Sequence, residues 1–332
     1  MDTLNNRLGT AAEQLHFNGA VRVDDAGTVI ELAFGLADRA HGLVNTPQTQ
    51  FGLASGSKAF TALAVLSLVA ERTMGLDDPV RRWLGGDLTR VDDHVTVRHL
   101  LSHTSGVGEY LDDDADPNEY LMPGSMHTYT SPEDLMPLLD VPMLGTPGEG
   151  FAYSNAGFVL LGLVAQRASG VRYQDLVRQR VIEPAGLTHT DFLRSDELPG
   201  TAAIGYLYPD GARTNVFHLP IEGSADGGAY STVADLRDFW TALAAGRIVS
   251  PALVEQMTTL GPDHDADDPY GLGIWLPKPG VWQLVGADAG VSMVSEHHPG
   301  RDLTMTVLAN DSEGAWPLWK ALRDATGTSH PD

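Results

Sequence analysis

A serine and a lysine three residues apart stand at the start of an apolar run. The stretch FGLASGSKAF, residues 51–60, places Ser55 before Lys58, and helical spacing continues to about Arg72. Residues three apart on a helix lie on one face, so the two side chains are neighbours. A serine hydroxyl becomes a nucleophile when a base takes its proton or when its alkoxide is stabilised, and Lys58 could do either. The alternative is a lysine that only extends its ammonium to water.

A tyrosine and an asparagine two residues apart precede a second apolar helix pattern, in AYSNAGF. Residues two apart on an extended segment point the same way, so Tyr153 and Asn155 could enter one cleft together. Tyr153 could then act as general base towards Ser55, and Asn155 could hold Lys58 and a substrate amide. The alternative is a simple helix entry, with Ser154 or Asn155 as the N-cap.

The composition limits the classes of partner. Lys and Arg number 21 against 44 Asp and Glu, and a formal charge of -23 argues against nucleic acid and anionic membranes as partners. The chain has no cysteine, which excludes disulfides and thiolate metal sites. The N-terminal residues lack the basic and apolar regions of a signal peptide, and the longest apolar runs are too short to cross a bilayer. We therefore expect a soluble cytoplasmic protein that acts on a small molecule.

Strand patterns at both ends of the chain enclose a helical middle. A helix is expected over 3–16, then two strands, GAVRV and TVIELAFGLAD, joined by a DDAG turn. Three strands and a final helix over about 316–325 close the chain. The pattern predicts an α/β sheet region formed by residues 1–76 and 191–332, with a mostly helical region inserted at 77–190. The two regions would form one catalytic unit with the cleft between them.

Several segments, in order, resemble the serine β-lactamase and penicillin-binding-protein superfamily, in its class C β-lactamase-like branch. That branch includes DD-peptidases, D-amino-acid peptidases and carboxylesterases. FGLASGSKAFTALAVLSLVAERTMGLDDPV is similar to its Ser-x-x-Lys helix, and PGEGFAYSNAGFVLLGLVAQRASG to its Tyr-x-Asn segment. VTVRHLLSHTSGV, ADGGAYSTVADLRDFW and YGLGIW are similar to further landmarks. The resemblance covers nearly the whole chain and implies an antiparallel sheet flanked by helices, with an inserted mostly helical region.

The resemblance also implies roles for four residues and no cofactor or metal. Ser55 would be the acyl-accepting nucleophile, Lys58 its activating partner and Tyr153 the base. Asn155 would hold the lysine and the substrate. The same Tyr153–Lys58 pair would activate the water that hydrolyses the acyl-enzyme.

The third motif of the superfamily departs from its usual form. It lies on a strand lining the cleft and usually reads Lys-Thr-Gly or His-x-Gly, whereas the segment VGADAGVSM places Ala287, Asp288 and Ala289 there. The basic residue is then absent, and Ala289 carries a methyl where the backbone normally stays bare. Asp288 would either repel a substrate carboxylate or face solvent in a turn. The backbone amide of Gly290 could pair with that of Ser55 as an oxyanion hole.

These features favour a serine hydrolase that acts on small carboxylic esters through an acyl-enzyme at Ser55. The alternatives with the same chemistry are a D-amino-acid peptidase or amidase, which could read an amine through Asp288, and a β-lactamase-type activity. A protein of another class, a non-catalytic β-lactamase-like binding protein, would also carry an altered third motif.

Other polar residues are given structural roles. His103, in LLSHTSG, is expected to be a loop residue, since Lys58 and Tyr153 already fill the role of base. His297 and His298 are expected in a turn between two strands, where adjacent side chains diverge and hold no metal. The acidic runs 112–116 and 263–268 lack the spacing of a calcium loop and are expected to be solvated.

The segment 109–129 contains Tyr110, Tyr120, Met122 and other large side chains, among them Met126 and Tyr129. It would either roof the cleft and select the acyl group or cover another part of the helical region.

Overall fold

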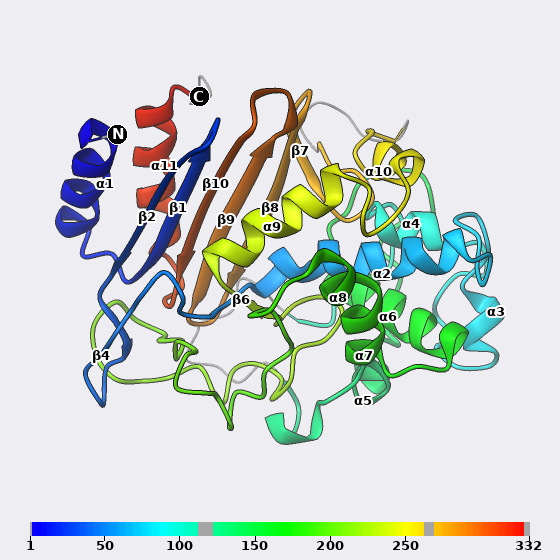
Figure 1. The fold of residues 1–332 in the computed structure, drawn as a ribbon. Helices are drawn as coiled ribbons and strands as arrows, with labels where there is room; N and C mark the ends of the chain where they lie inside the picture. Colours follow the sequence, from blue (N-terminus) through cyan, green and yellow to red (C-terminus); the bar gives the residue numbers. More distant parts are fainter. Residues whose placement is uncertain (1, 112–121, 262–268, 329–332) are drawn as a thin grey trace.

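The computed structural model describes residues 2–111, 122–261 and 269–328, and an antiparallel six-stranded sheet lies at its centre (Figure 1). The strand order is β2-β1-β10-β9-β8-β7, so strands from the two ends of the chain pair in mid-sheet. Their bounds are β1 Gly19–Asp25, β2 Thr28–Phe34, β7 Trp275–Lys278, β8 Val281–Asp288, β9 Val291–His298 and β10 Leu303–Ala309. Shorter pairs join β3 Leu36–Asp38 to β4 Leu43–Val44, and β5 Phe51–Gly52 to β6 Tyr230–Ser231.

The first hairpin forms as its sequence predicts. Asp25 pairs with Thr28, and the two residues between them, Ala26 and Gly27, have φ values of 46° and 85°. Two successive positive φ angles are those of a type I′ turn, whose twist matches that of the flanking strands. The DDAG turn is confirmed.

The sheet separates two apolar cores, because successive side chains of a strand point to opposite faces. Val21 and its neighbours on one face pack with the helices α1 Asp2–Gln14 and α11 Ala315–Thr326. Ala20 points to the other face, where α9 Val233–Ala244 crosses β10 and β1 (Figure 1). The predicted antiparallel sheet flanked by helices is therefore confirmed.

A helical layer packs beside the sheet, on the α9 side (Figure 1). Its helices are α2 Lys58–Ala70, α3 Arg81–Leu84, α4 Val97–Leu101, α5 Pro132–Leu135, α6 Asn155–Ser169, α7 Tyr173–Val177, α8 Glu183–Ala185 and α10 Pro251–Met257. The helix α2 is apolar on almost every side, and residues 58–68 are all buried, as expected for a helix at the centre of a layer. It contacts α6 and α7. The division of the chain at residues 77 and 190 stays a prediction.

The adjacent histidines do not form a turn, so this prediction was wrong. His297 and His298 end β9, and the turn follows at Pro299–Arg301. The ring of His297 stacks on Trp240 at 5.7 Å and bonds to Thr304 Oγ1 at 2.9 Å. His297 is therefore a buried residue at the end of a strand, where it packs against an aromatic ring.

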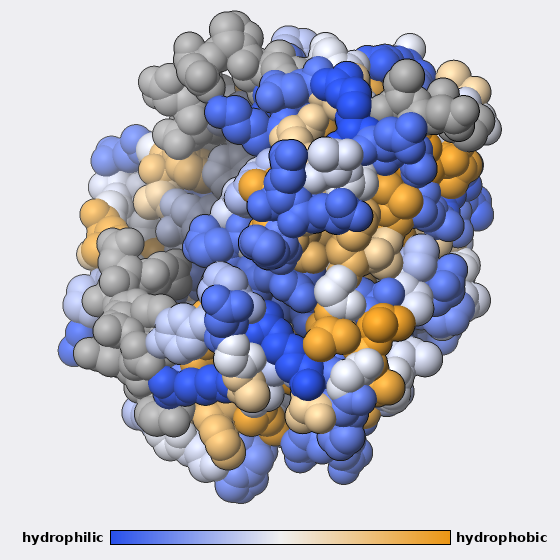
Figure 2. Space-filling model, turned by 90° about the vertical axis from the view of Figure 1, so that its left-hand side faces the viewer, coloured by the Kyte–Doolittle hydropathy of each residue, from blue (hydrophilic) through white to orange (hydrophobic). Residues whose placement is uncertain are grey.

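Most of the face drawn in Figure 2 is hydrophilic. Figure 2 shows the side of the molecule that lies at the left in Figure 1, where hydrophilic residues are interspersed with apolar patches. No helix in the described ranges is long and apolar enough to cross a membrane. Within the same ranges, no group of three or more His, Asp or Glu side chains could hold a metal ion. The acidic runs 112–116 and 263–268 lie outside the described residues.

Candidate active site

Ser55 lies in a short 3₁₀ turn, Ala54–Ser57, which leads directly into α2. The preceding residue, Ala54, has a φ of 43°, a left-handed conformation that is unfavourable for a residue with a side chain. Such strain persists only where the surrounding contacts impose it, and it concentrates at functional sites. Here the Ala54 carbonyl accepts a hydrogen bond from Ser57 Oγ at 2.8 Å. The turn holds Ser55 at the wall of a cavity.

Lys58 is only 2% exposed, and its ammonium donates to three acceptors. These are Ser55 Oγ at 2.9 Å, Asn155 Oδ1 at 2.8 Å and the backbone carbonyl of Asp226 at 2.6 Å. An ammonium has three N–H donors, so each finds a partner and the buried charge is fully hydrogen-bonded. The predicted serine–lysine pair is thus brought into contact, and the lysine does not extend to water.

Asn155 is the first residue of α6, and the helix start fixes its position. Ser154 is the N-cap, accepting from Gly157 N at 2.9 Å. The Glu109 carboxylate accepts from the backbone amides of Asn155 and Ala156, at 2.5 and 3.2 Å. A carboxylate at a helix N-terminus is favoured by the orphan amides and the helix dipole. Both predicted roles of this segment therefore hold together: Ser154 caps the helix, and Asn155 reaches Lys58.

Tyr153 lines the cavity next to Ser55, and its ring is held by aromatic neighbours. It lies parallel to Trp275 at 6.2 Å and contacts His103 at 4.2 Å between ring centroids. The Lys58 ammonium lies 5.0 Å from its ring centroid. His103 itself is buried and accepts from Ser154 N at 3.1 Å, so it orients this segment from behind. This fits the structural role expected for His103.

The third acceptor of Lys58, the Asp226 carbonyl, lies in a turn at the start of the landmark segment ADGGAYSTVADLRDFW, but its contact with the lysine was not predicted from the sequence. A backbone carbonyl has no side-chain signature, and this one lies far along the chain from Lys58. The turn passes close to the nucleophile: a Cβ on Gly227 would lie 3.2 Å from the Ala54 carbonyl carbon. Glycine at this position lets the two backbones approach.

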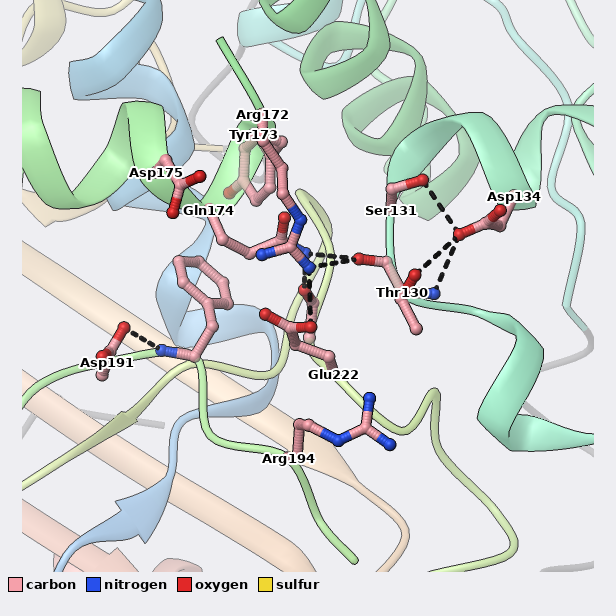
Figure 3. Close-up of polar contacts among 12 residues, drawn as sticks. Thr130, Ser131, Asp134, Arg172, Tyr173, Gln174, Asp175, Asp191, Arg194 and Glu222 are labelled. Carbon is pink, nitrogen blue, oxygen red and sulfur yellow. Dashed lines mark hydrogen bonds and ion pairs between the residues drawn. The ribbon is translucent and has the colours of Figure 1, made fainter. Parts of the chain in front are cut away.

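A polar brace fixes the start of this turn (Figure 3). Arg172 Nη2 donates to Glu222 at 2.7 Å and to the Thr130 carbonyl at 3.0 Å. Gln174 Nε2 donates to the same Thr130 carbonyl at 3.0 Å and to the Gly223 carbonyl at 2.9 Å. Gln174 is fully buried and its bond to the Gly223 carbonyl is shielded from competing water, whereas the bond from Arg172 to the Thr130 carbonyl is exposed. The brace links the turn to α7 and to the segment at Thr130.

The middle of the turn is fixed from α2. Thr61 Oγ1, one helical turn after Lys58, donates to the Ala225 carbonyl at 2.6 Å, and its oxygen also bonds to Tyr173 OH at 2.7 Å. Ala225 packs directly on α6, where a Cβ on Gly162 would overlap its methyl. The acceptor at Asp226 is therefore positioned by α2, α6 and α7 together.

The cavity in front of Ser55 has a volume of about 610 Å³, which suits a small organic substrate. Its apolar wall includes Leu193, Leu219, Pro220 and Ile221. Its polar lining includes Asn155, Asp226, Asp288, Ser312 and Glu313. A candidate nucleophile, a buried cation and a candidate base thus meet at a single concave site.

The sequence of the chain matches a known protein family along almost its whole length. The model of the family described as Beta-lactamase matches residues 6–325. The chain belongs to the β-lactamase family. It is 31% identical over 327 residues to Penicillin-binding protein 4* of Bacillus subtilis (strain 168), covering 92% of this chain and 70% of that one.

Two further comparisons bear on the fold and on the reaction. The crystal structure of a penicillin-binding protein from Bacillus halodurans superposes with a TM-score of 0.89 at 33% identity, over 96% of this chain and 99% of that chain. Esterase EstB of Burkholderia gladioli is 37% identical over 183 residues, 52% of this chain and 46% of the esterase. The β-lactamase family is thus one of serine hydrolases, and the predicted membership is confirmed.

The position of the third motif on β8 needs a correction. The residue that must lack a side chain is Gly286, because a Cβ there would overlap the Leu53 carbonyl oxygen and lie 3.0 Å from Gly56 N. Ala289 instead lies in the turn between β8 and β9. The position that must lack a side chain therefore lies three residues earlier than the sequence predicted. The basic residue of the motif is correspondingly replaced by Leu284, a buried apolar residue. In either placement, the motif contains no basic residue.

The Gly290 amide has another partner. It donates to Ser312 Oγ at 2.9 Å, within a turn where Gly290 has a φ of 73°. The expected pairing of this amide with that of Ser55 is therefore not supported. Asp288 is exposed and lines the cavity, and its Oδ1 also accepts from Ala289 N at 2.8 Å. The carboxylate therefore borders both solvent and the cavity, and its effect on a substrate carboxylate stays a prediction.

The segment after Glu109 has a divided role. Tyr110 and Met122 line the cavity, which fits a roof, whereas Met126 and Tyr129 are buried in the core. Tyr120 lies outside the described residues.

Proposed function

We propose that the protein hydrolyses small carboxylic esters through an acyl-enzyme at Ser55. The observation that carries the proposal is the set of three hydrogen bonds from the Lys58 ammonium. The bonds to Asn155 and to the Asp226 carbonyl fix the ammonium, and the remaining N–H donates to Ser55 Oγ. A cation in this position favours the developing alkoxide of the serine. The similarity to an esterase agrees with this choice of substrate.

The proposed reaction has two halves with the same proton carrier. Ser55 Oγ attacks the ester carbonyl while its proton passes to the phenolate oxygen of Tyr153, which the Lys58 ammonium would stabilise. The tetrahedral adduct collapses, and the leaving alkoxide takes that proton and departs as an alcohol. A water then attacks the acyl-serine and gives a proton to Tyr153. As the second adduct collapses, Ser55 Oγ takes that proton back and the carboxylic acid leaves.

We assign the oxyanion hole to the amides of Ser55 and Ala287. Ser55 is in the first turn of its helix, where N–H groups have no intrahelical acceptor. Asp288 pairs with Val291 across a two-residue loop, which makes theirs a hydrogen-bonded pair. Hydrogen-bonded and non-hydrogen-bonded pairs alternate along two antiparallel strands, so the N–H of the next residue, Ala287, points away from β9. It points to the other edge of β8, where the pairing with β7 ends at Gln283. Two backbone donors can stabilise the oxyanion without a side chain.

The absence of a basic third-motif residue guides the choice among the reactions of the family. Leu284 gives no cation for the carboxylate of a penicillin or of a peptidyl-D-alanine, so β-lactamase and DD-peptidase activities are disfavoured. An amidase for D-amino-acid substrates is the second candidate. It is favoured by the carboxylates of the cavity lining, Asp226 and Asp288.

Intact-protein mass spectrometry tests the proposal, after incubation with a fluorophosphonate and, separately, with a penicillin. We expect a fluorophosphonate adduct that disappears in Ser55→Ala, and no penicillin adduct. A stable penicillin adduct would instead assign a penicillin-binding protein. No adduct with either reagent would favour a non-catalytic binding protein. Turnover of a p-nitrophenyl ester against a D-alanyl anilide separates esterase from amidase.

A further inference from the structure

The charge of the cavity lining has one sign. Among the described residues that line it, the side chains of Asp226, Asp288 and Glu313 carry carboxylates, and none is a lysine or an arginine. The adjacent cation, Lys58, is buried and gives all three of its N–H groups to protein acceptors. A cavity with low-dielectric walls concentrates such a field and attracts ligands of opposite charge.

Three carboxylates act on one phenol in the roof. Tyr110 OH donates to Asp226 Oδ2 at 2.8 Å. Burial, and then the negative charges of Asp226, Glu109 and Asp288, raise the pKa of Tyr110 well above its usual value. Tyr110 therefore remains a neutral donor, and its hydrogen bond ties the roof of the cavity to the Asp226 carboxylate.

A second feature of the same turn indicates a missing polar partner. Ser224, two residues before Asp226, lines the cavity and is 3% exposed. Its buried hydroxyl oxygen has no hydrogen-bond partner among the described residues. Buried polar atoms in native proteins are almost always hydrogen-bonded, so an orphan beside a cavity points to a group supplied by a ligand.

We propose that the cavity selects substrates that carry a cationic amine near the scissile carbonyl, received between Asp226 and Asp288 below Tyr110. The inference rests on the proposed acyl-enzyme chemistry and names its substrate class: esters or amides of amino acids and related amino acyl groups. An ammonium matches this lining in two ways. Its charge is opposite to that of the carboxylates, and the rings of Tyr110 and Trp275 offer aromatic surface to a cation.

Three methyl esters of similar size test the charge preference: alanine methyl ester, methyl propionate and monomethyl malonate. They place an ammonium, a hydrogen or a carboxylate near the same carbonyl, and the released acid can be titrated at pH 7. We expect kcat/KM to decrease in that order. An ammonium also activates an ester chemically. The decisive quantity is therefore the ratio of kcat/KM for alanine methyl ester to kcat/KM for methyl propionate, compared between the wild type and the variants.

The variants Asp288→Asn and Asp226→Asn remove one charge each and keep the shape of the side chain. We expect the ratio to fall about tenfold in each, and added salt to lower it in the wild type. Asp210→Asn, at an exposed carboxylate outside the cavity lining, is the matched control and should leave the ratio unchanged.

The outcomes separate this inference from the function on which it rests. Equal ratios in wild type and both cavity variants, with Ser55 still labelled by the fluorophosphonate, would overturn the amine preference and leave the hydrolase intact. Faster hydrolysis of the malonate ester than of the propionate ester would also overturn it. Neither labelling nor turnover of any ester would refute the proposed function and the inference together.

Discussion

A methyl group added at Gly286 should disable the site without touching a catalytic side chain. The Cβ of Gly286→Ala would overlap the carbonyl oxygen of Leu53 and lie 3.0 Å from the amide of Gly56. Ordinary contact at these atoms requires β8 and the serine turn to separate by on the order of 1 Å. A shift of that size between reacting groups lowers rates about 100-fold, equivalent to about 2.7 kcal/mol of transition-state stabilisation. We therefore expect kcat/KM for a p-nitrophenyl ester to fall by at least that factor.

The control for this variant is Gly300→Ala, in the turn after β9, where a Cβ would meet no atom within 4 Å. It should keep wild-type activity. The folding of Gly286→Ala is checked by its thermal midpoint and its circular dichroism. A folded Gly286→Ala enzyme with activity within threefold of wild type would refute the close contact between β8 and the serine turn.

The complementary variant Ala289→Gly distinguishes the two positions of the third motif. If Ala289 were the position facing the nucleophile, removal of its methyl would open the cleft and raise activity or allow penicillin to acylate Ser55. Because Ala289 lies in the β8–β9 turn, we expect no gain of either kind. A clear gain would restore the position expected from the sequence.

Three further changes test the support of the site and of the fold. Lys58→Met keeps the length of the buried side chain but removes its donors, so kcat should fall by about 10²–10⁴ while the protein stays folded; activity near wild type would contradict the role of the lysine. Gln174→Met leaves the Gly223 carbonyl without its amide donor, and urea unfolding should show a loss of about 1–3 kcal/mol. Burial lowers the pKa of His297 to about 4, so below pH ~6.5 the unfolded chain binds a proton that the folded chain does not. Stability should then fall between about pH 6.5 and 4 by up to ~3 kcal/mol, and His297→Gln should reduce this fall in urea titrations.

The sequence predicted which side chains the structure brings together at the candidate site. The spacing of Ser55 and Lys58 places both on one helical face, and the structure joins them directly. Tyr153 and Asn155 follow from an extended segment that enters a helix. In each case a short-range spacing determines the relation, so no long-range information is needed.

Contacts made by backbone atoms were harder to predict than contacts between side chains. The carbonyl of Asp226 contacts Lys58 across a long separation in sequence, and any residue type supplies the same carbonyl. The third motif was placed three residues late, with Ala289 at the position that stays bare, because the strand lacks the lysine or histidine that usually marks the start of the motif. Only the close approach of the Leu53 carbonyl oxygen to Gly286 identifies the position that must lack a side chain.

The carboxylates of the cavity also bear on how a reaction cycle would end. Hydrolysis converts a neutral ester into a carboxylate anion, which is formed beside Asp226, Asp288 and Glu313. Like charges in a confined space repel, so the acid should leave readily and bind back weakly. Product inhibition by acetate or butyrate should accordingly be slight at low ionic strength, and stronger in Asp288→Asn. For substrates without an amine, an enzyme with this lining would therefore release its acid product quickly.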